Sequence, residues 1–209
     1  MTSFLVKAFL TLFVVIDPLG LTPIFISLVG NRSSAEQARV ARRAILVAGA
    51  IVLAFTLGGT LLLQYLGISI EAFQVAAGVL LLKIAIDMVF AQRERETEEE
   101  KQEAQLREDI SVFPLAIPLI AGPGTLASIL ILVSEANAYP FGLIIILAIA
   151  AIVLFMAYTL LCLSSNLSRV LGQTGINVVT RVLGVLLSAL AVQYIANGVV
   201  VILKPVFRS

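Results

Sequence analysis

Two interruptions rich in proline and glycine, about 105 residues apart, each lie inside an apolar segment of this 209-residue chain. The first is Ile-Asp-Pro-Leu-Gly-Leu-Thr-Pro at residues 16–23, and the second runs from Pro114 to Thr125. Such residues inside a lipid-spanning helix leave backbone groups unpaired, which hydrocarbon tolerates only where the backbone is buried in protein or lines a cavity. Two such interruptions at matching positions of two halves indicate the binding site of a transporter.

Composition places the chain in a membrane. Hydrophobic residues make up 60% of the sequence and charged residues only 13%, whereas soluble domains carry about 25% charge. No basic patch with interleaved aromatic residues is present, so we expect the lipid bilayer, and not nucleic acid, as the partner. Six apolar segments have the length needed to cross a bilayer. They are residues 4–29, 43–66, 69–91, 111–134, 140–163 and 178–203.

The basic residues predict the orientation. The loops that follow the first, third and fifth segments hold nine arginines and lysines, and the opposite side holds three. The nine are Arg32, Arg39, Arg42, Arg43, Arg93, Arg95, Lys101, Arg107 and Arg169, and the three are Lys7, Lys204 and Arg208. Because basic loops stay in the cytoplasm, both termini are predicted on the non-cytoplasmic side.

Further landmarks repeat at nearly the same spacing as the two interruptions. Pro18 matches Pro123 at a spacing of 105 residues, and Gly78 matches Gly184 after one inserted residue. Three segments per half is an odd number, so the second half enters the membrane from the opposite face. We therefore predict an all-α membrane fold of six transmembrane helices in two inverted three-helix repeats, with the first and fourth helices broken. Residues 1–91 form the first repeat, 92–110 a charged cytoplasmic linker, and 111–209 the second, inverted repeat.

Asp17 lies near the middle of the first span. A lone carboxylate at that depth costs about 2.5–3.5 kcal/mol on insertion scales, so such a residue usually faces the bundle interior. It can cap the half-helix that follows, with Pro18 at the first helical position. Equally, it can contact a substrate amine or a coupling cation. The two roles are compatible, and the sequence leaves both open.

The half-helices that follow the breaks predict a site for a zwitterion. Their N-termini, after Pro18 and Pro123, direct unpaired N–H groups into the membrane centre, where a carboxylate is a natural ligand. Carbonyl oxygens freed by Pro23, Pro118 and Pro123 can accept a cation or an ammonium group. The small residues around the breaks permit close backbone approach, although they also serve plain helix packing, which is the role that we expect for Ser128.

The sequence also predicts roles for the other polar residues. Lys83 and Asp87 are spaced i,i+4 on the third span and are expected to pair, with Asp87 as a proton or cation relay the alternative. Glu71 and Glu135 are expected to be solvated at span ends. Three tyrosines are expected at the membrane interface, namely Tyr65, Tyr139 and Tyr194. The chain has no histidine and shows no nucleophile–base pair or metal-ligand spacing, so no catalytic residue, metal site or cofactor is expected, and the protein is not predicted to be an enzyme.

Three motifs resemble the MarC family of bacterial inner-membrane proteins. They are Asp-Pro-Leu-Gly in the first span, Ile-Ala-Gly-Pro-Gly-Thr in the fourth and Ile-Asp-Met in the third. The resemblance covers essentially the whole chain and implies a multi-pass protein of the bacterial inner membrane. A related branch of the family comprises small neutral amino acid transporters that move glycine and alanine with a cation gradient.

The resemblance implies a secondary transporter of small neutral amino acids coupled to H⁺ or Na⁺. The substrate is expected between the broken first and fourth spans, at Asp17, Pro18, Gly20, Thr22, Pro23, Gly122, Pro123, Gly124 and Thr125. The coupling ion is expected at Asp17 and Asp87. An exporter of another small metabolite, or a membrane scaffold that does not transport, are the alternatives, and self-association into a homo-oligomer is left open.

Overall fold

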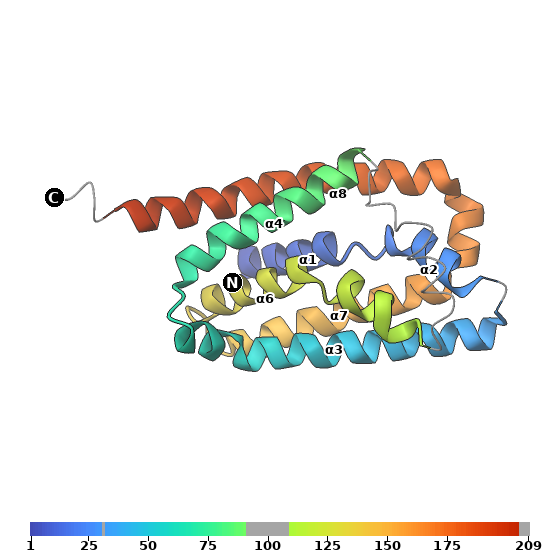
Figure 1. The fold of residues 1–209 in the computed structure, drawn as a ribbon, viewed down its shortest axis with the longest axis horizontal. Coiled ribbons are helices and arrows are strands. Elements are labelled where there is room, and N and C mark those ends of the chain that lie inside the picture. The colour runs from blue at the N-terminus through green and yellow to red at the C-terminus, as the bar shows by residue number, and fades with distance from the viewer. Residues whose placement is uncertain (31, 91–108, 205–209) are drawn as a thin grey trace.

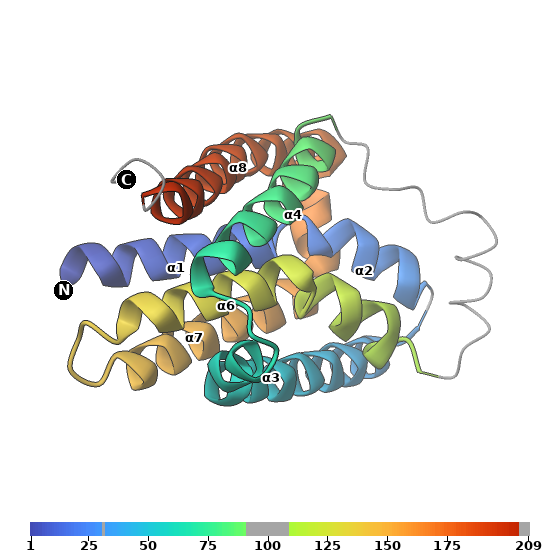
Figure 2. The ribbon, with the colours of Figure 1, turned by 60° about the vertical axis from the view of Figure 1, so that its left-hand side comes forward.

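The structure is a computed structural model that describes residues 1–30, 32–90 and 109–204, and the regular elements in these ranges are helices. In chain order they are α1 (Thr2–Ile16), α2 (Leu21–Val29), α3 (Ser34–Tyr65), α4 (Ile70–Phe90), the π-helix η1 (Ser111–Ile120), α6 (Pro123–Ala136), α7 (Gly142–Cys162) and α8 (Ser164–Leu203). They form an elongated bundle (Figures 1 and 2). We call the end with the N-terminus and the turns at 66–69 and 137–141 the terminal end. The opposite end, where α2 and α7 end, is the linker end.

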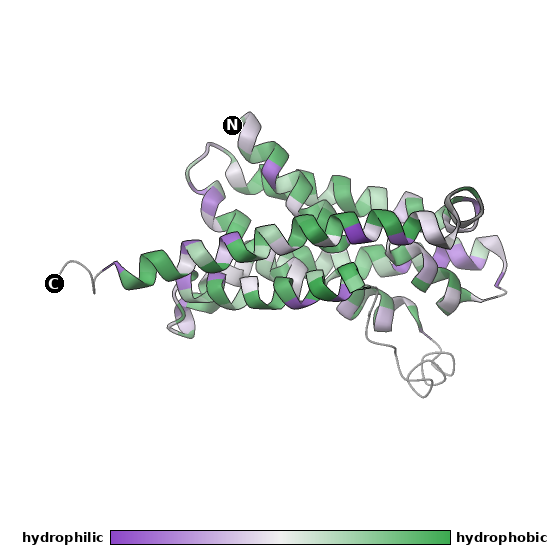
Figure 3. Cartoon of the chain, turned by 90° about the horizontal axis from the view of Figure 1, so that it is seen from above, coloured by the Kyte–Doolittle hydropathy of each residue, from purple (hydrophilic) through white to green (hydrophobic). Residues whose placement is uncertain are grey.

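Five of the expected six spans are present, and a sixth is present if a bent pair of helices counts as one span. Five uninterrupted or gently broken stretches are long and apolar enough to cross a membrane, and η1 with α6 forms a sixth as a pair bent by 51°. The five are Thr2–Val29, Ser34–Tyr65, Ile70–Phe90, Gly142–Cys162 and Thr174–Leu203. Hydrophobic residues run along most of the length of these helices (Figure 3), and many of the large ones are exposed, among them Leu57, Phe90 and Phe155. The chain is therefore an integral multi-pass membrane protein, because only such an environment accommodates so much exposed apolar surface.

Two predicted boundaries need correction. Helix α3 begins at Ser34, nine residues before the predicted span, because Ser33 and Glu36 form a capping box in which each binds the other's backbone N–H. Helix α8 begins at Ser164 and turns sharply at Gly172, whose φ of 63° is readily adopted only by glycine. Both features extend helix beyond the apolar segments, so hydropathy alone did not indicate them.

The predicted linker at 92–110 lies almost entirely outside the described residues, which resume at Asp109. There Asp109 accepts a hydrogen bond from Ser111 at the start of η1. It also forms an ion pair of 2.8 Å with Arg43 of α3. The Ser111 hydroxyl, followed by the Arg43 guanidinium, holds the pKa of the Asp109 carboxyl below its ordinary value. These contacts fix the entry of the fourth span against the second.

Helices α4 and α8, the third and sixth spans, share the most extensive helix–helix contact of the described chain. Glycines let the two backbones approach closely. A Cβ on Gly78 would lie 2.7 Å from the carbonyl oxygen of Ala191 and 2.6 Å from Ile195. A Cβ on Gly184 would lie 3.1 Å from the carbonyl oxygen of Ala85. Side chains larger than hydrogen therefore do not fit at either position.

Two polar residues lie where the sequence did not place them. Tyr194 is not an interface anchor, because its side chain is 1% exposed and packs in the core with Ala127 and Ile131. Glu135 is not simply solvated, because it binds Lys7 of α1. Tyr65, which is 90% exposed at the end of α3, lies where an interface anchor is expected. Sequence position gives the depth of a side chain in the bilayer but not the face of the helix that its neighbours cover.

The close approach of α4 and α8 predicts a difference between two glycines. Gly78→Leu should lower thermal stability, because overpacking a tight contact costs about 1–3 kcal/mol. Gly58→Leu is the matched control, since a Cβ on Gly58 meets nothing within 4 Å. Thermal unfolding of the detergent-solubilised variants measures the effect. Equal stability of the two variants would contradict the close packing of α4 on α8.

Candidate functional site

The break in the first span is a short loop between α1 and α2. Asp17 ends α1 in the left-handed conformation, with φ 47° and ψ 63°, which aspartate tolerates better than most residues. Its N–H donates to the carbonyl of Phe13, its own carbonyl accepts from Leu21, and its Oδ1 accepts the Gly20 N–H at 3.0 Å. The carboxylate is 3% exposed. Asp17 thus binds backbone groups on both sides of the break.

The capping expected of Asp17 is found only in part: its carboxylate accepts the N–H of Gly20, the N-cap residue of α2, but no side chain caps the first turn of α2 itself. Pro18 is not the first helical residue, because α2 begins at Leu21 after Gly20. Thr22 donates through both its N–H and its hydroxyl to the carbonyl of Leu19. That carbonyl is the one that Pro23, four residues on and without an N–H, cannot bind. The Leu19 oxygen, which the sequence offered to a cation, is therefore already hydrogen-bonded.

The break in the fourth span begins inside η1. Phe113 and Ile117, the residues before Pro114 and Pro118, are extended and not helical. Helix α6 then starts at Pro123, with Gly122 as its N-cap residue. A Cβ on Gly122 would lie 2.2 Å from the Pro118 carbonyl oxygen, so only glycine fits there.

Helices α2 and α6 both begin without a side-chain cap, but they differ in nearby charge. The Asp17 carboxylate binds the N–H of Gly20 just before α2, whereas the first turn of α6 has no acidic residue. Thr125 is 2% exposed, and its hydroxyl donates back across the break to the Ile120 carbonyl at 2.8 Å. The first N–H groups of a helix have no acceptor within the helix. The start of α6 therefore retains capacity to bind an anion.

The fold brings the two breaks close together. A Cβ on Gly124 would lie 3.4 Å from Val15, in the last turn of α1, and 3.1 Å or less from Leu81 and Ile84 of α4. Ile16 and Ala121, which flank the two breaks, belong to one buried apolar cluster. Both breaks thus lie side by side in the interior of the bundle.

Most of the predicted site residues are buried in protein. The buried ones are Asp17, Pro18, Gly20, Thr22, Gly122, Gly124 and Thr125, while Pro23 is half-buried and Pro123 is exposed. An open apolar groove of about 430 Å³ between α3, α4 and the second break includes Pro118 and Pro123, but its lining includes no residue of the first break. This groove faces outward and lacks polar side chains, so it does not suit a polar ligand.

Asp87 forms the ion pair that its spacing predicted, with Lys83 at 3.5 Å. It lies on α4 one turn beyond Ile84, the residue that contacts the position of Gly124. In the described parts of the chain, no three cysteine, aspartate or glutamate side chains come together as metal ligands. Carbonyl and carboxylate oxygens at the breaks are the groups that suit a hard monovalent cation or a proton.

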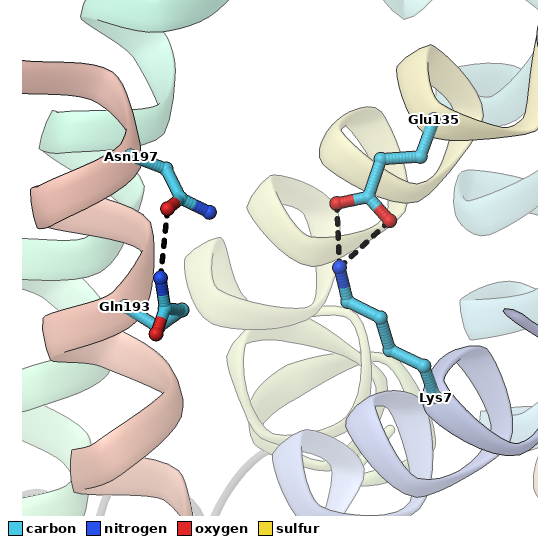
Figure 4. A network of polar contacts seen from close by, with 4 residues as sticks. All are labelled: Lys7, Glu135, Gln193 and Asn197. Atoms are coloured by element: carbon cyan, nitrogen blue, oxygen red, sulfur yellow. Dashed lines mark hydrogen bonds and ion pairs between the residues drawn. The ribbon is translucent and has the colours of Figure 1, made fainter. Parts of the chain in front are cut away.

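Sequence reasoning missed one interaction between the two broken spans. Lys7 Nζ of α1 contacts both carboxylate oxygens of Glu135 of α6, at 2.7 and 2.8 Å (Figure 4). The topology already placed both residues at the same end of the bundle, and their opposite charges were the signal that could have paired them.

Comparisons with known proteins agree with this fold. Residues 2–203 match the family described as MarC family integral membrane protein. A UPF0056 membrane protein of Methanocaldococcus jannaschii is 38% identical over 198 residues, which cover 94% of this chain and 96% of that protein. The UPF0056 membrane protein YhcE of Escherichia coli is 36% identical over 92% of this chain and 90% of its own. No solved structure matches. A family match over nearly the whole length, with relatives above 30% identity, means that this chain belongs to the MarC family of integral membrane proteins.

Proposed function

We propose that this protein is a secondary transporter of small neutral amino acids of the glycine and alanine type, driven by H⁺ or Na⁺, and not an enzyme. One observation carries the proposal: the two breaks lie close together inside the bundle, an aspartate carboxylate precedes the half-helix α2, and the half-helix α6 starts without an acidic residue or a side-chain cap. The uncapped start of α6 suits a substrate carboxylate. The buried carboxylate of Asp17 suits the substrate ammonium or a coupling cation. A small substrate is in keeping with the tight packing around both breaks.

Reciprocal contacts support the inverted repeat on which transport would depend. Gly78 approaches Ala191 and Ile195, while Gly184 approaches Ala85 and Val89. In the repeat alignment, each residue on one helix matches the residue 106 positions later, so Ala85 matches Ala191 and Val89 matches Ile195. Residues related by a two-fold axis make such paired contacts, in which i meets j′ and i′ meets j. A pseudo-two-fold axis between α4 and α8 explains this pattern.

The repeat suggests how access alternates. Two inverted halves can exchange conformations, so that one bundle rocks or slides against the other around a fixed site. The linker end carries the arginines at 32, 39, 42 and 43, and by the positive-inside rule it faces the cytoplasm. The proposed location is the bacterial inner membrane, with both termini on the non-cytoplasmic side.

Uptake by purified protein tests the proposal directly. Proteoliposomes should accumulate labelled glycine and alanine when an H⁺ or Na⁺ gradient is imposed, and unlabelled small neutral amino acids should compete. The gradient that supports uptake identifies the coupling ion. Folded protein that moves neither amino acid in either direction would contradict the substrate assignment and favour another metabolite or a scaffold role.

Asp17→Asn should separate capping from charge. An asparagine oxygen still accepts the Gly20 N–H, and asparagine tolerates the left-handed conformation, so thermal stability should stay close to that of the wild type. Transport should fall by about tenfold or more, because a hydrogen bond to a charged group contributes roughly 1.5–3 kcal/mol. Initial uptake rates and thermal unfolding measure the two quantities on the same preparation.

Asp17→Ala is the matched variant, because it removes the cap and the charge together. Its stability should fall by about 1 kcal/mol relative to Asp17→Asn, the usual cost of losing a cap. Wild-type transport by Asp17→Asn would instead assign Asp17 to capping alone.

A further inference from the structure

Each broken span has one half at the terminal end of the bundle and one half towards the linker end, and these halves are packed differently. At the terminal end, α1 packs directly on α6. Towards the linker end, α2 packs on α7 and α8, whereas η1 packs on α3. The terminal halves are therefore in contact with each other while the linker halves are held by different helices.

The seam between α1 and α6 contains buried hydroxyl groups. Ser128 is 0% exposed, and its Oγ has no hydrogen-bond partner. It lies one helical turn beyond Gly124, on the face of α6 that meets Val15 of α1. Thr11, one turn before Val15 on α1, is buried as well, at 4% exposed.

Tyr194 of α8 closes the third side of this seam. Its hydroxyl is buried without a hydrogen bond of normal geometry, and its polar neighbours are Thr11 and Glu135. Buried polar atoms in native proteins are normally paired, so an unpaired one needs an explanation. Two buried hydroxyls that lack a hydrogen bond of normal geometry, on separate helices around one seam, point to a polar guest that occupies it in another state.

The Lys7–Glu135 ion pair lies at the outer end of the seam, with side chains 40% and 30% exposed. It joins α1 to α6 at the terminal end. On the neighbouring α8, the Gln193 side-chain amide donates a hydrogen bond to the Asn197 side-chain oxygen at 2.7 Å (Figure 4). Along the seam, the polar groups thus run from the ion pair, past Tyr194 and Thr11, to Ser128 and the breaks.

We propose that this seam is the non-cytoplasmic arm of the transport path, that the hydroxyls of Thr11, Ser128 and Tyr194 bind a passing zwitterion, and that Lys7 and Glu135 form its gate, here closed. The inference rests on the proposed function for the identity of the zwitterion. The proposed gate and path involve only α1, α6 and α8 and do not depend on which substrate passes. Separation of the ion pair would open the seam from the terminal end while the path to the linker end is blocked.

Thiol accessibility tests the gate without any substrate. Ser128→Cys is introduced into a Cys162→Ala background, since Cys162 is the only cysteine of the chain and is exposed. A membrane-impermeant maleimide is applied to right-side-out and to inside-out vesicles. With the gate intact, Cys at 128 should react slowly from both sides. In Lys7→Gln/Glu135→Gln it should react faster from the terminal side only, by up to about fivefold, the upper effect expected of a half-exposed ion pair.

Two further variants distinguish a gate from a general loosening of helix packing. The charge exchange Lys7→Glu/Glu135→Lys should restore slow labelling, because it rebuilds the pair with reversed polarity. The control Arg43→Gln/Asp109→Asn removes the ion pair between α3 and the segment that enters η1, at the linker end, and should leave labelling from the terminal side unchanged. Unaltered labelling in the Lys7/Glu135 variant, or faster labelling in the control as well, would overturn the proposal. Faster terminal-side labelling in a protein that moves no amino acid would support the gate and reject only the substrate.

Discussion

The structure depends on one constraint: backbone N–H and carbonyl groups must be paired where no water reaches them. Continuous helices meet that demand without side chains. At the two breaks the chain meets it with Asp17, Thr22 and Thr125, each of which binds a backbone group within five residues of itself. These local hydrogen bonds let an irregular backbone persist at membrane depth, and the surrounding helices then bury it.

Burial of the breaks in turn requires close helix packing. Helices in lipid gain little from apolar contact as such, because the lipid tails are equally apolar, so tight van der Waals contact between small residues matters more. Gly124 brings the start of α6 against α4 and α1, and Gly78 and Gly184 bring α4 against α8. The glycines of this chain therefore divide into those that shape the breaks, such as Gly122, and those that join the spans.

Much of this arrangement can be predicted from local sequence. Hydropathy gives the spans, and proline with glycine gives both breaks, because each acts through its own backbone. The sequence does not give the face of a helix that its neighbours cover, which is why Tyr194 was placed at the interface and Glu135 in solvent. The early start of α3 had a local signal in Ser33 and Glu36, but the change to π-helix in η1 had none beyond its two prolines. The roles of the predicted site residues in binding remain predictions, because proximity and burial are what the fold provides.

The unequal charge of the two breaks bears on how a site between the proposed inverted repeats would hold one substrate orientation. A perfect two-fold axis would present the same groups from both halves and bind a zwitterion either way round. Here the break of the first half supplies a carboxylate, which binds the N–H of Gly20, while the first turn after the second break has no acidic residue. Because these differences are fixed by sequence, exchange of conformation between the repeats would change the side from which the site is reached but not the charges that it presents. In the proposed transporter, alternating access and a constant polarity of binding would thus be compatible, provided that symmetry governs the helices and asymmetry is confined to the breaks.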